Sequence, residues 1–159
     1  MNRRMLLVLL AVAAAVLAVL GVLASQASLS TLEEPGPTET YLATTAKHWL
    51  VGRAARGLEA PAAAADGMSE LRGEMNYIAR CRACHGADGR TPTDVGRALY
   101  PRTPDLGSAA VQQYTDAELF VVIHDGVRLS GMPGFGKIHS DQEIWDLVRY
   151  VRSRAPPKN

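Results

Sequence analysis

The sequence has few cysteines, no dominant charge and no strand pattern. Its formal net charge is +1 over 159 residues, and no long run of like charge occurs. This balance is typical of neither a nucleic-acid-binding protein nor a disordered tail, so we expect no nucleic acid among the partners. No segment alternates between apolar and polar residues as a half-buried strand does. We therefore predict an all-α fold.

The longest apolar segment lies near the N-terminus. Residues 5–24 contain no charged side chain and follow Arg3 and Arg4. As a helix, such a run is long enough to cross a bilayer core of about 30 Å. A cleaved signal peptide begins in the same way, and residues 25–27 would suit cleavage, but its apolar core is usually shorter. We predict a retained anchor over residues 1–27 that inserts residues 5–24 into the lipid bilayer.

The two arginines also orient this anchor. Positive residues tend to stay on the cytoplasmic side of a membrane, so the chain from Ser25 onward would lie on the outer side. We predict a single-pass protein of a bacterial cytoplasmic membrane whose remaining residues lie in the periplasm.

Residues 28–66 form the predicted linker. Residues 29–40 carry prolines, a glycine and several acids, which is the composition of a spacer. Residues 41–57 return to helix formers and place Trp49, Arg53 and Arg56 at helical spacing, which predicts a short basic amphipathic helix. A second break at residues 61–67 separates it from one small domain, residues 67–159.

Three helices are predicted in this domain. The first runs from Ser69 to Ala83. The other two open with capping boxes, Thr115 to Glu118 and Ser140 to Glu143, and run to about His124 and Ser153. The first helix has an apolar face made of Leu71, Met75, Ile78 and Ala79.

Residues 86–109 form a long loop rich in glycine and proline. A small domain rarely contains so long an irregular loop unless the loop wraps something. About ninety residues also bury only a modest core by themselves. Both features predict a large bound apolar group.

The only two cysteines, Cys81 and Cys84, stand three apart and are followed by His85. A thioredoxin-like redox pair would lie beside a βαβ pattern, which is absent. A zinc site would need further ligands, and His124 and His139 are too far apart for the usual spacing. Covalent haem attachment needs only the CxxCH motif, because two thiols one helical turn apart can add to the two vinyl groups while the histidine lies under the iron. We favour haem.

The other histidines have simpler interpretations. We expect His124 to be a solvated residue at a helix end, where its charge suits the helix dipole. We expect His139 at the surface, and His48 in a packing pair with Trp49.

A second iron ligand is sought downstream of the motif, where Met132 is the only methionine. It lies in residues 130–136, whose glycines and prolines let the backbone approach a flat ring closely. A thioether suits a haem that transfers electrons without changing ligands. The alternatives are that Met132 fills a gap in the core, or that Met68 is the ligand.

In combination, these motifs identify a family resemblance. Residues 67–154 resemble a class I, mono-haem c-type cytochrome. The resemblance rests on CRACHG (81–86), LYPRTPDL (99–106), DGVRLSGMPGF (125–135) and DQEIWDLVRYVRS (141–153).

The resemblance implies a cytochrome c fold, in which three or four short helices wrap around one covalent haem c. Cys81 and Cys84 would form the thioethers, and His85 and Met132 would be the axial ligands of the iron. The carbonyl of Pro104 would accept a hydrogen bond from the histidine ring. The resemblance also implies that Gly73 and Tyr77 pack against the last helix near Trp145 and Tyr150.

The resulting hypothesis is a one-electron carrier or haem subunit with no chemistry of its own. Its partner would be a membrane redox complex: a quinol-oxidising complex, a terminal oxidase, a dehydrogenase or a photosynthetic reaction centre. A haem-based redox or gas sensor, and a haem enzyme acting on peroxide or nitrogen oxides, are the alternatives. The candidate residues around the exposed haem edge are Arg82, Ala83, Ala87, Arg128, Leu129 and Gly134.

Overall fold

The computed structural model describes residues 2–25, 30–61 and 67–157. The chain divides into two units, residues 1–30 and residues 31–159, and each is described by itself. The first unit is the helix α1 (Arg3–Ser25), whose residues are all exposed. It is the one helix in the described parts of the chain that is long and apolar enough to cross a membrane. This agrees with the predicted anchor; residues 26 and 27 of that prediction lie outside the described residues.

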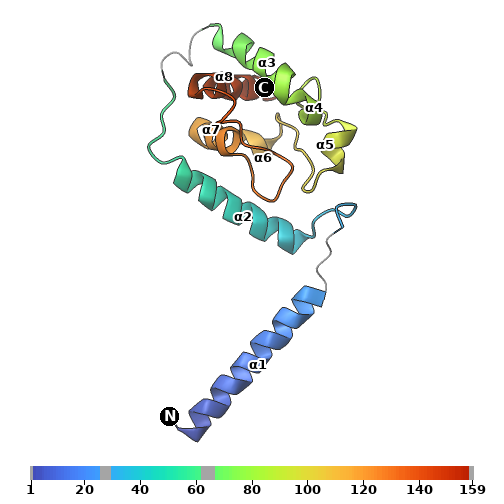
Figure 1. Ribbon diagram of the computed structural model, residues 1–159, viewed down its shortest axis with the longest axis vertical. Coiled ribbons are helices and arrows are strands. Elements are labelled where there is room, and N and C mark those ends of the chain that lie inside the picture. Colours follow the sequence, from blue (N-terminus) through green and yellow to red (C-terminus); the bar gives the residue numbers. More distant parts are fainter. Residues whose placement is uncertain (1, 26–29, 62–66, 158–159) are drawn as a thin grey trace. The chain divides into compact units, whose positions relative to one another are not determined.

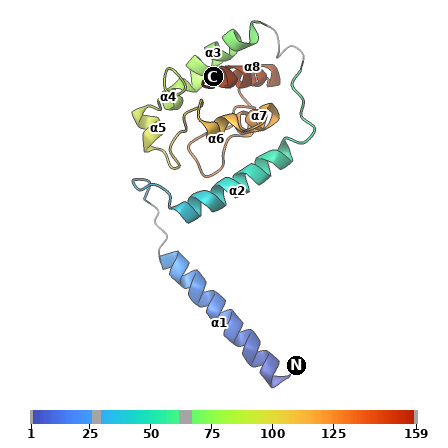
Figure 2. The same cartoon turned by 180° about the vertical axis from the view of Figure 1, so that it is seen from behind.

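The described residues of the second unit form helices joined by loops, with no strand among them. The all-α prediction is therefore confirmed. Figure 1 shows α3 and α8 side by side, with α7 beneath them, and Figure 2 shows the same arrangement from behind. The helices are α2 (Pro37–Ala54), α3 (Ser69–Arg80), α4 (Arg82–His85), α5 (Asp94–Ala98), α6 (Ala109–Gln112), α7 (Asp116–Asp125) and α8 (Asp141–Ser153).

The closest helix contact joins α3 to α8 at Gly73. A Cβ atom at this position would lie 2.0 Å from the carbonyl oxygen of Asp146 and 3.0 Å from Cβ of Tyr150. One turn later, the rings of Tyr77 and Tyr150 lie 4.6 Å apart. The absence of a side chain at Gly73 therefore allows the two backbones to approach. The predicted packing of Gly73 and Tyr77 on the last helix is confirmed. The ring of Trp145 stacks on Phe120 of α7.

A buried carboxylate reinforces the same contact. Asp146 is 1% exposed, and it accepts hydrogen bonds from the Ser69 hydroxyl at 2.5 Å and from Nε of Arg72 at 2.7 Å. Burial acts to raise the pKa of Asp146, but the hydrogen bonds from Arg72, Ser69 and Gln142 more than offset it, so the pKa is lowered. The carboxylate thus stays ionised and ties the start of α3 to the middle of α8.

Both predicted capping boxes are present. Thr115 and Glu118 exchange hydrogen bonds at the start of α7, and Ser140 and Glu143 do so at the start of α8. These caps satisfy backbone donors that would otherwise be unpaired. The two helices then meet through buried apolar side chains, including the stacked rings of Phe120 and Trp145, whose centroids are 4.5 Å apart.

Three details of these predictions differ from the structure. The first helix ends at Arg80 and not at Ala83. The face of α3 that packs is not its apolar face, because Leu71, Met75 and Ile78 are exposed by 49%, 65% and 47%. The buried face instead carries Gly73 and Tyr77, and the close approach of α8 requires the glycine there. The loop over residues 86–109 is also not continuous, since it contains the short helix α5, which Thr93 caps by accepting a hydrogen bond from the Gly96 N–H.

The helix α2 packs against α7 and starts and ends earlier than predicted. Ala55, just past its end, is buried, and Val51 packs on the hydrophobic core. The prediction of an amphipathic helix is wrong, because Leu42, Trp49 and Leu50 are exposed while other apolar residues face the core. Its side chains do not separate into one apolar and one polar face.

The α3–α8 contact makes a testable prediction. Replacing Gly73 with Ala should destabilise the fold by about 1–3 kcal/mol, because the new methyl group would overlap the backbone of α8. Denaturant unfolding of the purified protein measures this. Met75→Ala, at an exposed position of the same helix, is the control and should change the free energy of unfolding by less than about 0.5 kcal/mol. Equal effects of the two substitutions would contradict the close contact.

Candidate functional site

The cysteines lie on the helical turn that follows α3, with Cys81 at the end of α3 and Cys84 in the short helix α4. Cys81 ends α3, where its N–H donates to the Tyr77 carbonyl at 2.8 Å. The Cys81 carbonyl then accepts from the N–H groups of Cys84 and His85, at 3.1 and 3.0 Å. Both thiols are free and partly buried. The sequence spacing therefore becomes one helical turn, which places the two sulfurs and the imidazole on a single short segment.

Several contacts hold the backbone of this turn. The Tyr77 hydroxyl donates to the Gly86 carbonyl at 2.6 Å, and the Thr93 hydroxyl donates to the Ala83 carbonyl at 2.7 Å. Gly96 packs so closely that a Cβ atom there would lie 2.2 Å from the Cys84 carbonyl oxygen. Sequence analysis did not identify Thr93, although its position before Asp94 is that of a helix cap. These contacts keep the turn in one conformation.

The structure brings Pro104 to the ring of His85. Burial lowers the pKa of His85, and a backbone interaction with Pro104 acts in the opposite direction. Nδ1 of His85 is buried and has no partner at standard hydrogen-bond distance and angle among the described residues, so the contact with Pro104 is looser than an ordinary hydrogen bond. The lowered pKa favours the neutral imidazole, which is the form that can bind a metal.

Cys81 does not have the electrostatics of a redox-active thiol. Burial raises its pKa to about 11, and Cys84 adds to the effect. Redox pairs of the CxxC type instead have a lowered pKa, which supplies the reactive thiolate. Within the described ranges, no group of three or more His, Cys, Asp or Glu residues is placed to hold a metal ion.

Met132 lies in a loop that folds back onto the end of α7. Its carbonyl accepts from the Val127 N–H at 3.1 Å, and its own N–H donates to the Ser130 hydroxyl at 3.2 Å. A Cβ atom at Gly134 would lie 2.7 Å from the Asp125 backbone, so glycine is required there. Met132 and Cys81 both pack against the same hydrophobic core. Two residues fifty positions apart are thus brought to one core, whereas Met68 is exposed by 55%.

The three other histidines are placed as follows. His124 is 36% exposed at the end of α7, as expected, and Nδ1 lies 2.6 Å from the Asp125 carboxylate. The prediction that His139 lies at the surface is wrong, because its side chain is only 8% exposed. A tight turn, in which the His139 N–H donates to the Phe135 carbonyl, folds it inward.

His48 also differs from the prediction. It stacks on Tyr114 with ring centroids 4.4 Å apart, and not on Trp49. The Trp49 ring is covered instead by the Arg53 guanidinium, 4.9 Å from its centroid. Adjacent residues on a helix point in different directions, so the pair cannot share one contact.

Comparison with known proteins identifies the family. Residues 69–151, more than half of the chain, match the family model described as cytochrome c oxidase, cbb3-type, subunit III. The chain belongs to this family of cytochrome c domains. The match contains Cys81, Cys84, His85 and Met132, and it excludes α1 and α2.

The proteins similar to this cytochrome have different names, which include a dehydrogenase and a c-type cytochrome. It is 36% identical over 94 residues to a thiosulfate dehydrogenase from Allochromatium vinosum, covering 55% of this chain and 32% of that protein. The chain therefore spans about a third of that relative's length. A chain of the Kuenenia stuttgartiensis reducing HAO-like protein complex is 23% identical with a TM-score of 0.55, over 63% of this chain and 48% of that one; this likeness concerns the fold. The KustC0563 c-type cytochrome is 28% identical with a TM-score of 0.47, over 53% of this chain and 98% of that one.

The residues of the cytochrome domain fit a covalent haem c, the group that the family implies. Two free thiols lie on one turn, the adjacent imidazole has a lowered pKa, and its Nδ1 is buried without a standard partner. A methionine packs on the same core as the first cysteine. The group would supply a one-electron couple between ferrous and ferric iron.

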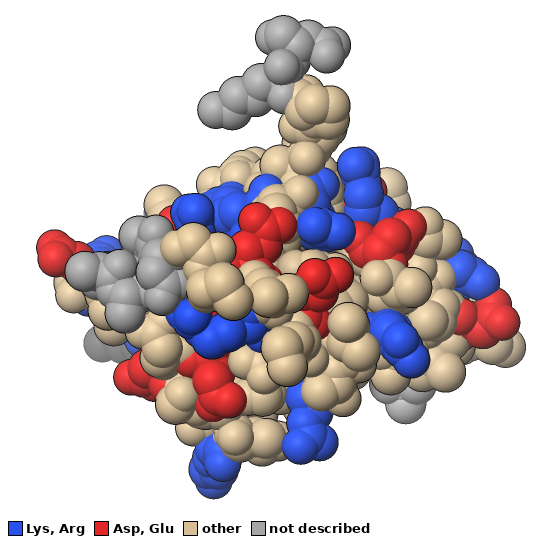
Figure 3. Space-filling view, turned by 90° about the horizontal axis from the view of Figure 1, so that it is seen from above, with Lys and Arg blue, Asp and Glu red and all other residues tan. Residues whose placement is uncertain are grey.

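The candidate residues around the proposed haem edge lie at the surface. The six candidate edge residues, Arg82, Ala83, Ala87, Arg128, Leu129 and Gly134, are all exposed. Leu129 is 92% exposed and has a φ of 63°, an unusual conformation for a branched residue. Figure 3 shows blue and red side chains interspersed, with no patch of one sign on the face that it draws.

Proposed function

We propose that this cytochrome transfers single electrons through one haem c held by thioethers from Cys81 and Cys84. His85 and Met132 would be the axial ligands of the iron. The observation that supports this most directly is that Cys81, the first residue of the CxxCH motif, and Met132 pack against one core, although they are far apart in the sequence. The two cysteines of the chain suffice for one haem.

The proposed ligand set favours electron transfer over catalysis. If both axial positions were filled by side chains, substrate would have no free position at the iron. The hydrogen bonds and close glycine contacts of the turn and of the Met132 loop keep both ligands in place. The Pro104 carbonyl would orient the ligand ring through Nδ1, and such outer contacts tune the metal. A fixed ligand set lets the oxidation state change with little rearrangement.

We further propose that α1 tethers the domain to the membrane on its outer side. A domain tethered by a linker has a high effective concentration for partners in the same bilayer. The family description supports a terminal oxidase or a related membrane complex as the partner. The alternative partners are a quinol-oxidising complex, a dehydrogenase and a reaction centre. Each of them would exchange electrons through a brief contact with the exposed haem edge.

The ligand assignment predicts the effect of Met132→Ala. The wild-type ferric protein should show the weak far-red band of sulfur-ligated haem, and the variant should lack it. The variant should also bind carbon monoxide when reduced and have a lower reduction potential, because methionine ligation raises the potential. Visible spectroscopy and a redox titration measure these effects.

Met75→Ala, at a site that is 65% exposed, is the control for Met132→Ala and should behave as wild type. An unchanged far-red band in Met132→Ala would contradict the assignment of this ligand. Carbon monoxide binding by the reduced wild type would favour the enzyme or sensor hypotheses.

Thiosulfate oxidation is a second candidate function, because the thiosulfate dehydrogenase is 36% identical over the matched residues. The match spans only about a third of that protein, so we expect this chain to accept electrons and not to oxidise thiosulfate itself. Thiosulfate added to the oxidised protein should leave its spectrum unchanged, while a small chemical reductant should reduce it at once. Rapid reduction by thiosulfate alone would establish the second candidate.

A further inference from the structure

The helix α2 carries apolar side chains on two of its sides. Val51 packs on the hydrophobic core, and Ala55, just past the end of the helix, is buried. By contrast, Leu42, Trp49 and Leu50 are exposed by 61%, 59% and 50%. Packing on the domain requires only one apolar side of a helix. The domain therefore does not account for the apolar residues on the second side.

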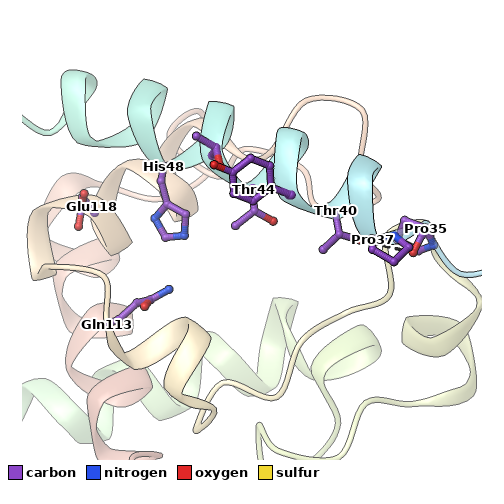
Figure 4. A pocket seen from close by; sticks show the side chains of 9 residues that line it. Pro35, Pro37, Thr40, Thr44, His48, Gln113 and Glu118 are labelled. Atoms are coloured by element: carbon purple, nitrogen blue, oxygen red, sulfur yellow. Dashed lines mark hydrogen bonds between the residues drawn. The ribbon is translucent and has the colours of Figure 1, made fainter. Parts of the chain in front are cut away.

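These exposed residues lie together on an outer face. Figure 4 shows Thr40, Thr44 and His48 on the side of α2 that faces the domain, where they line an open groove of about 930 Å³. Because residues two apart differ by about 200° around a helix axis, Leu42 lies opposite Thr40 and Thr44. Figures 1 and 2 show the other helices of the second unit on the inner side only. The outer face consists of Leu42, Ala46, Trp49, Leu50 and Arg53, all of them exposed.

The side chains of the outer face suit the boundary between lipid chains and headgroups. Tryptophan is enriched at this boundary, because its ring is apolar and its N–H is polar. The Arg53 guanidinium lies 4.9 Å from the Trp49 ring centroid, so a cation adjoins the apolar side chains. An arginine can bury its stem among apolar groups and keep its charge at the polar side. Arg56, three residues later, is also exposed and adds a second cation.

The acidic residues near the start of α2 are held by the domain. The Glu39 carboxylate accepts a hydrogen bond from the Tyr100 hydroxyl at 2.5 Å, and Glu34 forms an ion pair with Arg102 at 3.0 Å. The outer face itself carries the charge of Arg53 and no carboxylate. Positive charge beside apolar residues is the combination with which a helix binds a surface of anionic lipids.

The order of the elements along the chain favours a lipid surface as the occupant of the outer face. The helix α1 is long and apolar enough to cross a bilayer, and only residues 26–36 separate its end from the start of α2. A segment of that length spans at most about 40 Å. If α1 crosses the membrane, α2 is held near the lipid at a high effective concentration.

We propose that the outer face of α2 lies on the surface of the membrane that α1 crosses. Trp49 is at the headgroup boundary, and Arg53 and Arg56 lie beside lipid phosphates. This proposal rests on the proposed tether, since α2 would otherwise have no bilayer within reach. A single tether limits the distance of a domain from the membrane, whereas a second contact also fixes its orientation. The helix α2, which lies outside the family match, thus presents the cytochrome domain to its partners from one side.

The test uses the full-length, haem-loaded protein in vesicles of phosphatidylcholine and phosphatidylglycerol. The chain has two tryptophans, and Trp145 is only 5% exposed. Lipid contact of Trp49 can therefore be measured by tryptophan fluorescence, because acyl chains brominated near the headgroup quench an indole that they touch. Quenching by haem is the same in brominated and ordinary vesicles, so the ratio of the two emissions reports lipid contact.

Brominated lipid should reduce the emission of the wild type and leave that of Trp49→Phe unchanged. Arg53→Gln should weaken the quenching, because the outer face then loses its charge. Arg149→Gln, at an exposed position of α8, is the control and should be quenched as strongly as the wild type.

An unquenched wild type on vesicles that carry the protein in flotation would overturn the proposal and leave the tether intact. Protection of Trp49 from acrylamide in native membranes, without quenching in lipid vesicles, would assign the outer face to a protein partner and would also overturn it. A protein that does not float with the vesicles would overturn the proposed tether itself.

Discussion

The close approach of α3 and α8 at Gly73 determines where the CxxCH turn lies. The helix α3 can reach the Asp146 backbone only because position 73 has no side chain. The ionised Asp146 then ties Ser69 and Arg72 to α8. Since Cys81 follows two turns after Gly73, this crossing also fixes the start of α4 beside the core that Met132 contacts. A domain of this size has few other apolar contacts with which to position two segments distant in sequence.

Local chemistry explains what could be predicted from the sequence. The capping boxes at Thr115 and Ser140 involve residues three apart, so the starts of α7 and α8 follow from sequence spacing alone. The single turn of Cys81 and Cys84 is local for the same reason. The packed face of α3 depends on α8, which is distant in sequence, so the apolar pattern alone did not identify it. His139 is buried by a turn with Phe135 that no sequence motif marks.

The contacts of the helix α2 could not be predicted from the sequence either. Its composition predicts a helix, but its contacts with Tyr114 and Tyr100 come from two segments that only the tertiary fold brings together. No motif marks it, because its residues are common surface types. The helix α2 packs against α7, and its Val51 contacts the hydrophobic core, so this segment is more than a spacer.

The central claim is that one haem is bound covalently at Cys81 and Cys84 in a chain that keeps its N-terminal helix. Intact mass spectrometry of the detergent-extracted protein, before and after acid-acetone treatment, tests this most directly, because that treatment removes only non-covalent haem. The account predicts the mass of the full chain plus one haem, unchanged by the treatment and reduced to the bare polypeptide when both cysteines are replaced by serine. A wild-type mass equal to the bare polypeptide would contradict it.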